Sequence, residues 1–162
     1  MTLKDFELTE DNHFVAMEYY ALILNRTYLV LMTNDYLIGL LGNGIVSVES
    51  STGLYAKKIT KSLAINGDLN NPHCYLKETY IRKIENVNLL DGSILTENKS
   101  NFIIKRNEIK KAWYDPRKKW GMGYYPHDGK VYIETIVRKK REFIILGNQS
   151  GRRIADNIIM AK

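Results

Sequence analysis

The chain has 162 residues, of which 44% are hydrophobic and 26% are charged, and 24 Lys and Arg against 18 Asp and Glu give a net charge of +6. This length and composition predict a single soluble domain over residues 1–162 and exclude a chain that is disordered throughout. A lone cysteine excludes an intrachain disulfide, an acidic start excludes a signal peptide, and no uncharged run approaches the roughly 20 residues of a membrane helix, so we expect a cytoplasmic protein without a transmembrane segment.

The first element expected is a helix over residues 11–24. Thr9 or Asp11 could cap it, and several of the apolar residues that follow lie near helical spacing. The tyrosines of this segment leave a strand open as the alternative. With the helix in place, residues 1–24 could form an N-terminal helical extension of the domain.

A β-hairpin is expected next. The runs TYLVLMT (27–33) and YLIGLLG (36–42) are rich in apolar, β-branched and aromatic residues, and the Asn-Asp pair between them suits a two-residue turn. The glycines of GNG (42–44) predict a second turn, which leads into IVSVES (45–50).

In the middle of the chain the sequence predicts a helix over residues 72–85. Asn71 is a good capping residue, and Pro72 after it suits the first helical position. The apolar residues that follow lie along one side of such a helix. LLDGS (89–93) is typical of a turn.

The last third has the alternation of β-strands. In VYIETIV, Val131 and Ile133 would face one way, while Tyr132 and Glu134 would face the other. The four strands predicted here are 102–106, 109–115, 131–137 and 142–147, with the charged VRKKR as the last turn.

An amphipathic helix is expected to close the chain. Asn148 or Ser150 could cap it, and Ile154, Ile158 and Ile159 form an apolar stripe along one face.

The phrasing FIIKRNEIKKAW…GKVYIETIVRKKREFIIL…GRRIADNII resembles the latter half of bacterial pleckstrin-homology-like (PH-like) domains. The shared feature is the order strand, strand, long loop, strand, charged turn, strand, amphipathic helix, and it covers residues 101–161. The resemblance implies an α+β fold, an antiparallel bent barrel closed by the C-terminal helix, with the helix near 72–85 as an insertion. It also implies a binding module, with ligands that range from lipid headgroups to peptides and proteins.

Charge is divided unevenly along the chain. Residues 1–98 hold 8 Lys and Arg against 12 Asp and Glu, and residues 99–162 hold 16 against 6, so the net charges are −4 and +10. The asymmetry indicates an anionic partner for the second part, and its alternative is a basic surface that serves only solubility.

The loop over residues 115–130 is the strongest candidate for a binding surface, because it is longer than a hairpin needs. Cations beside aromatic faces can hold phosphate and stack a ring or a base. In the alternative interpretation, the aromatic residues pack the loop onto the barrel and the bases are merely solvated. The predicted ligand-binding residues of this loop are Arg117, Lys118, Lys119, Trp120 and Tyr124.

Two more cations, Arg152 and Arg153, fall in the first turn of the terminal helix, where the macrodipole favours anions. The amides of residues 151–153 and the two guanidinium groups could form a phosphate or carboxylate site. Alternatively, Arg153 lies back along the barrel as a packed stem.

No catalytic residue, cofactor or metal site is predicted. His13, His73 and His127 lack the spacing of a zinc site, and the motifs of hydrolases and nucleotide-binding proteins do not occur. His127 and Asp128 could form an acid–base pair, but Pro-His-Asp-Gly is typical of a turn.

We therefore expect a non-enzymatic binding or adaptor module that contacts an anionic partner, either an acidic protein surface or a lipid headgroup, through the basic–aromatic loop. A nucleic-acid-binding protein that uses the same surface is the alternative. A homo-oligomer also stays open, because the apolar, tyrosine-containing region 14–48 would suit an interface.

Overall fold

The computed structural model describes residues 1–21, 24–47, 67–120, 122 and 125–160. Within these residues, one antiparallel sheet has the strand order β4-β3-β2-β1-β7-β6-β5. Strands β1 to β4 form one meander, β5 to β7 form another, and the pairing of β1 with β7 joins the two. The strands are β1 (His13–Ala21), β2 (Leu24–Met32), β3 (Tyr36–Ser47), β4 (Phe102–Lys105), β5 (Ile109–Asp115), β6 (His127–Thr135) and β7 (Lys140–Leu146).

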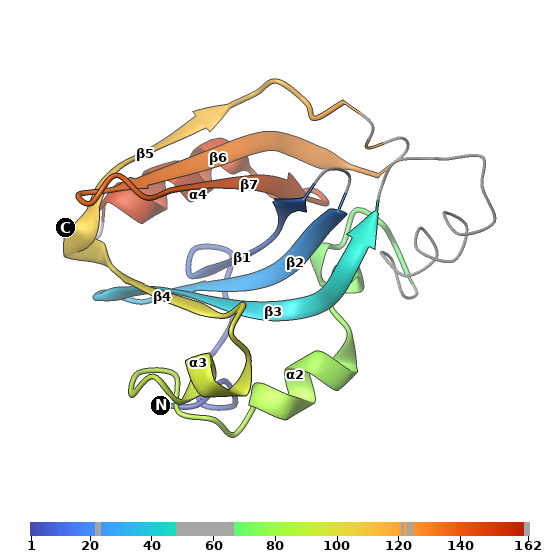
Figure 1. Ribbon diagram of the computed structural model, residues 1–162. Helices are drawn as coiled ribbons and strands as arrows, with labels where there is room; N and C mark the ends of the chain where they lie inside the picture. The colour runs from blue at the N-terminus through green and yellow to red at the C-terminus, as the bar shows by residue number, and fades with distance from the viewer. Residues whose placement is uncertain (22–23, 48–66, 121, 123–124, 161–162) are drawn as a thin grey trace.

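The sheet is curled, so that β5, β6 and β7 lie over β2, β3 and β4 (Figure 1). Helix α4 (Gly151–Met160) packs against β5 and β6. Helices α2 (Glu78–Ile84) and α3 (Ser93–Glu97) lie below the lower strands in the same view. The short 3-10 helices are η1 (Pro72–Tyr75) and η2 (Arg106–Glu108). The expected α+β class, with an antiparallel sheet and a C-terminal helix, is confirmed.

Two hydrophobic cores lie on opposite faces of the central strands. The inner core fills the curl and is closed by α4, and the outer core is covered by η1, α2, α3 and the N-terminal residues. Alternate residues of one strand serve the two cores: Phe14 and Ala16 of β1 belong to the inner core, and Val15 and Met17 to the outer core. Strand β1 is therefore buried on both faces and contributes side chains to both cores.

The helix predicted over residues 11–24 is wrong, because strand β1 occupies most of this segment. Residues 14–17 are all fully buried. A strand that is covered on both faces buries consecutive residues, so its sequence lacks the alternation of a half-buried strand and can imitate a helix. The predicted N-terminal helical extension is wrong for the same reason, since the residues before β1 form turns and Leu3 packs on the outer core.

The predicted β2–β3 hairpin is confirmed. Its turn at Asn34 and Asp35 is held by Tyr36, whose backbone N–H donates to Oγ1 of Thr33 at 2.9 Å.

The turn predicted at residues 42–44 is wrong, because β3 continues through these glycines to Ser47. Glycines in β3 allow neighbouring side chains to pack closely on the strand. A Cβ on Gly39 would lie 1.9 Å from the ring of Phe102, and one on Gly42 would lie 2.3 Å from the side chain of Leu76. Residues 48–50 of the predicted IVSVES strand lie outside the described residues.

The helix predicted over residues 72–85 is present in two pieces, η1 and α2, with an extended break between them. The Asn71 cap is confirmed, since its Oδ1 accepts a hydrogen bond from the backbone N–H of His73 at 3.0 Å. The break has a tertiary cause: Lys77 N–H donates to the carbonyl of Gly42 at 2.7 Å, and this contact draws the chain out of a continuous helix. LLDGS forms a turn at Gly92, whose φ is 85°, and α3 begins directly after it.

The predicted strands of the last third are confirmed, but β6 begins at His127, earlier than expected. The loop between β5 and β6 therefore covers residues 116–126. The charged turn after β6 is tight, with Arg138 at a φ of 59°. Among the described helices, none combines the length and the apolar character that a membrane span requires.

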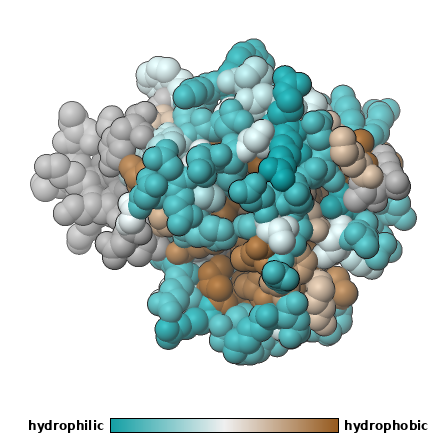
Figure 2. Space-filling view, turned by 180° about the vertical axis from the view of Figure 1, so that it is seen from behind, coloured by the Kyte–Doolittle hydropathy of each residue, from teal (hydrophilic) through white to brown (hydrophobic). Residues whose placement is uncertain are grey.

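Most of the rear face is hydrophilic (Figure 2). Among the large hydrophobic side chains that the structure describes, Trp120 is the most exposed, at 88%. Trp120 lies in the loop between β5 and β6.

Candidate anion-binding surface

The loop between β5 and β6 is fixed to the body of the protein on both sides of Trp120. Before it, the backbone N–H of Lys119 donates to Nε2 of His127 at 3.2 Å. After it, Met122 is 2% exposed and Tyr125 is 5% exposed, and both belong to the outer core. The loop therefore has packed anchors, and Trp120 is an outward-pointing residue between them.

The segment of residues 118–120 carries two cations beside this tryptophan. Lys118 is exposed and Lys119 is half-buried. In the part of the chain that the structure describes, no carboxylate forms an ion pair with either ammonium group. The 118–120 segment thus combines unpaired positive charge with an exposed indole ring.

Arg117, the next cation, has a partner. Its guanidinium donates to both carboxylate oxygens of Asp115, with a shortest distance of 2.7 Å from Nη2 to Oδ2. The side-chain and backbone hydrogen bonds from Arg117 lower the pKa of Asp115 to about 2. Both groups stay charged near neutral pH, and the pair turns Arg117 back toward the end of β5.

Tyr124 was also predicted to bind the ligand, but it lies outside the described residues.

Three bases that precede the loop are also occupied. Arg106 is only 6% exposed, and its guanidinium donates to the carbonyls of Thr33, Asn157 and Ile158, which ties η2 to the end of α4. Lys110 and Lys111 lie 3.8 and 3.4 Å from the carboxylate of Glu134. Arg106 therefore has a structural role, and the charges of Lys110 and Lys111 are balanced by Glu134.

An aromatic pair lies on the outward face of β5 and β6. Trp113 stacks on Tyr132 with a centroid distance of 5.0 Å and an interplanar angle of 12°. Nζ of Lys111 lies 4.7 Å above the Trp113 ring. Trp113 is therefore held by its neighbours, unlike Trp120.

At the N-terminus of α4, where the sequence left open an anion site or a packed arginine, two of the three backbone amides already have acceptors within the chain. The backbone N–H of Gly151 donates to Oδ2 of Asp128 at 2.7 Å, and that of Arg153 donates to Oγ of Ser150 at 3.3 Å. Oδ1 of Asp128 also accepts the hydroxyl hydrogen of Tyr114 at 2.7 Å. The carboxylate of Asp128 already occupies the place of the expected ligand.

The two arginines of this helix differ from each other. Arg153 forms ion pairs with Glu10 and Asp11, at 3.0 and 2.6 Å. Hydrogen bonds with Asn157 and Arg153 lower the pKa of Asp11. Arg152 is exposed and lies 5.7 Å from the centre of the Tyr114 ring. Only Arg152 stays available, at the base of the loop.

His127 and Asp128 do not form the acid–base pair considered from the sequence. Nε2 of His127 accepts from Lys119, so in the neutral ring Nδ1 carries the hydrogen and donates to the carbonyl of Tyr125 at 3.0 Å. Burial lowers the pKa of His127, and nearby Lys118 and Lys119 lower it further. Both residues hold the loop and the helix in place.

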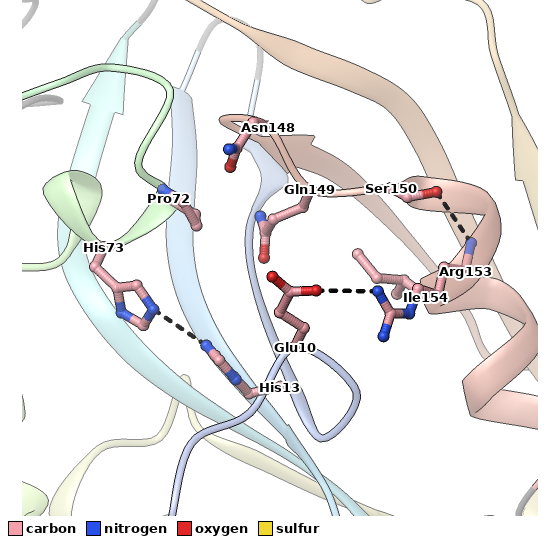
Figure 3. Close-up of a pocket in the computed structure, with 9 residues that line it drawn as sticks. All are labelled: Glu10, His13, Pro72, His73, Asn148, Gln149, Ser150, Arg153 and Ile154. Atoms are coloured by element: carbon pink, nitrogen blue, oxygen red, sulfur yellow. Dashed lines mark hydrogen bonds and ion pairs between the residues drawn. The ribbon is translucent and has the colours of Figure 1, made fainter.

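A pocket that the sequence does not reveal lies between the residues around the start of β1, η1 and the turn that leads into α4 (Figure 3). Its volume is about 320 Å³. His13 and His73 meet there, with their Nε2 atoms 3.1 Å apart. Residues so far apart in the chain carry no local signal of this contact. The lining residues are Glu10, His13, Pro72, His73, Asn148, Gln149, Ser150, Arg153 and Ile154.

Burial lowers the pKa of both pocket histidines. Burial also raises the pKa of the neighbouring Cys74 thiol, which makes it a poor nucleophile. Across the described ranges, no group of three or more His, Cys, Asp or Glu side chains is placed to hold a metal ion.

No protein-family model matches this chain, and neither a curated protein nor a solved structure matches it.

Proposed function

We propose that this protein is a non-catalytic binding module that docks on an anionic phospholipid surface through residues 118–120. One observation carries the proposal: Trp120 is 88% exposed beside Lys118 and Lys119, yet it is anchored on both sides. A tryptophan is favoured at the boundary between lipid and water, because its ring is apolar and its N–H is polar. Each lysine near an anionic bilayer contributes about 1 kcal/mol of attraction.

Preorganisation supports the same proposal. A mobile loop loses conformational entropy when it binds, whereas a loop with packed anchors has less entropy to lose. Met122 and Tyr125 provide those anchors in the outer core. Arg152, exposed at the base of the loop, adds a further cation on the proposed contact surface.

We further propose that the fold is PH-like. Two antiparallel meanders of four and three strands, joined through β1 and β7 and closed by α4, support this assignment. The helices η1, α2 and α3, between β3 and β4 in the chain, would then be an insertion that covers the outer core.

The chain allows a direct optical test, because Trp113 and Trp120 are its two tryptophans. In a Trp113→Phe variant, fluorescence reports on Trp120 alone. We expect its emission to shift to shorter wavelength with vesicles that contain phosphatidylserine and to stay unchanged with pure phosphatidylcholine. The shift should shrink at high salt, because the lysine contribution is screened.

Two double variants remove the same charge from different places. Lys118→Gln/Lys119→Gln should weaken vesicle binding by roughly tenfold or more. Lys110→Gln/Lys111→Gln, which removes cations that already face Glu134, should weaken it much less. Equal losses in the two variants would refute a specific role for residues 118–120.

Poly-glutamate and single-stranded DNA provide the remaining arms of the experiment. If the protein binds poly-glutamate but not anionic vesicles, the partner is an acidic protein and not a lipid surface. If it binds single-stranded DNA but not the vesicles, the partner is a nucleic acid. A salt slope that matches several phosphate contacts would identify the nucleic acid.

A further inference from the structure

Two histidines from distant parts of the chain meet at one side of the pocket in Figure 3. Nε2 of His13 lies 3.1 Å from Nε2 of His73, and the ring centroids are 5.1 Å apart. Glu10 lies between this pair and Arg153 in the same view. The binding surface proposed above uses none of these residues.

The hydrogen bonds of His13 fix which ring nitrogen is free. Its Nδ1 lies 2.5 Å from the carbonyl oxygen of Thr9. A carbonyl can only accept, so Nδ1 carries the hydrogen, and Nε2 of the neutral ring keeps its lone pair. This lone pair accepts the hydrogen bond from Nε2 of His73. A backbone carbonyl on one ring nitrogen and a lone pair on the other is the arrangement typical of a metal-binding histidine.

We propose that His13 and His73 bind one divalent transition-metal ion of the zinc class, with Glu10 as a third ligand and water as the remainder. Imidazole nitrogens bind such ions at about 2.0–2.1 Å, so two of them on one ion are about 2.9–3.4 Å apart at coordination angles between 90° and 110°. The observed 3.1 Å lies within this range. To bind both nitrogens, the ion would displace the hydrogen that they share and lie to one side of the line that joins them, because the midpoint of 3.1 Å is too close to each nitrogen for a metal–imidazole bond.

Rigid elements present both ligands. His13 is the first residue of β1 and pairs with Leu31 of β2. His73 lies in η1, where Asn71 caps its backbone N–H. The turn between β7 and α4 is held against the residues that lead into η1, because Asn148 N–H donates to the carbonyl of Asn70 at 2.9 Å.

The charges around the pocket favour a cation. Glu10 and Asp11 contribute two carboxylates against the single guanidinium of Arg153. Glu10 has an 87% exposed side chain, so it can rotate toward the histidines. Arg153 would still keep its ion pair with Asp11 at 2.6 Å. As the structure stands, Glu10 is not placed with the histidines as a ligand, so the third bond requires this rotation, after which the arginine keeps Asp11 as its partner.

Because Glu10 must turn to complete the set, the site should bind more weakly than a closed structural zinc site with four protein ligands. The test is isothermal titration of the chelator-treated full chain with Zn²⁺, repeated with Ni²⁺. We expect one ion per chain and a rise in melting temperature on loading. His13→Gln and His73→Gln should each raise the apparent Kd at least about tenfold, and Glu10→Gln by a smaller factor.

Controls separate this site from other metal ligands and from the lipid surface. His127→Gln and Cys74→Ser should bind Zn²⁺ like the wild type, since neither side chain lines the pocket. Lys118→Gln/Lys119→Gln should also bind Zn²⁺ normally while losing vesicle binding. The proposal is overturned by the absence of saturable binding, or by binding that persists in both pocket-histidine variants.

Discussion

The start of α4 and the 118–120 segment differ in how their polar groups are paired. At the start of α4, the chain itself provides partners for the N–H groups of Gly151 and Arg153 and for the guanidinium of Arg153. In the 118–120 segment, no carboxylate among the described residues pairs with the ammonium groups of Lys118 and Lys119. The two regions are similarly basic in sequence. The difference shows that a basic group is available to a ligand only where no carboxylate lies near it in space. The number of charges in the local sequence does not predict this.

The largest effect on stability should come from removing the hydrogen bonds at the start of α4. Asp128→Ala removes the acceptor for both Gly151 N–H and the Tyr114 hydroxyl. We expect a loss of about 2–3 kcal/mol in the free energy of unfolding, measured by urea denaturation. Asp128→Asn keeps an acceptor and should lose about half as much. A wild-type midpoint for Asp128→Ala would show that this network does not hold the helix.

Tyr114→Phe tests one bond of the same region. It removes the hydroxyl that donates to Asp128 and leaves the ring, on which Arg152 lies. The expected loss in the free energy of unfolding is about 1 kcal/mol. Unchanged vesicle binding in this variant would show that the hydrogen bond between Tyr114 and Asp128 has no part in the contact.

The two tryptophans extend the comparison to aromatic residues. Trp120→Ala should change the free energy of unfolding by less than about 0.5 kcal/mol, because the side chain is exposed, while vesicle affinity falls at least about tenfold. Trp113→Ala should lose about 1 kcal/mol with its stacking on Tyr132 and keep vesicle binding. The same outcome for both variants would remove the distinction between the exposed and the packed indole.

The smallest effect is a pH dependence. Because the folded protein lowers the pKa of His127 below its ordinary 6.5, the stability due to its neutral ring is complete above pH 6.5 and is lost as the pH falls through the folded pKa. Protonation of Nε2 also removes the acceptor for Lys119 N–H. Stability measured from pH 7.5 to 5 should therefore fall more in the wild type than in His127→Gln. Parallel curves for the two proteins would contradict this role.

Local signals predicted much of the fold. The Asn-Asp turn, the Asn71 cap, the strands of the last third and the closing helix depend on a few neighbouring residues, and all are present. The sequence-based predictions were wrong where residues distant in the chain determine the local structure. The region around Met17 is a strand whose second face is covered by the outer core, and the carbonyl of Gly42 interrupts the helix at Lys77.

In the candidate site, too, the sequence predicted the features that depend on neighbouring residues and missed those that depend on distant ones. Lys118, Lys119 and Trp120 were identified from their clustering, and the structure leaves them exposed or unpaired. The partners that occupy Arg153 lie 142 and 143 positions away in the chain. The meeting of His13 with His73 depends on the packing of η1 against β1, for which the sequence has no local pattern.

The joint between β1 and β7 has a consequence for the order of folding. Ala16 pairs with Ile145, and beside this contact Glu18 forms an ion pair with Arg141 at 2.6 Å. Each meander can form from hairpins of short sequence separation, but the joint must close a loop that spans most of the chain, at a high entropic cost. We expect the joint to be the slow, late step. A nascent chain would thus hold its first strands with an unpaired β1 edge until translation reaches β7.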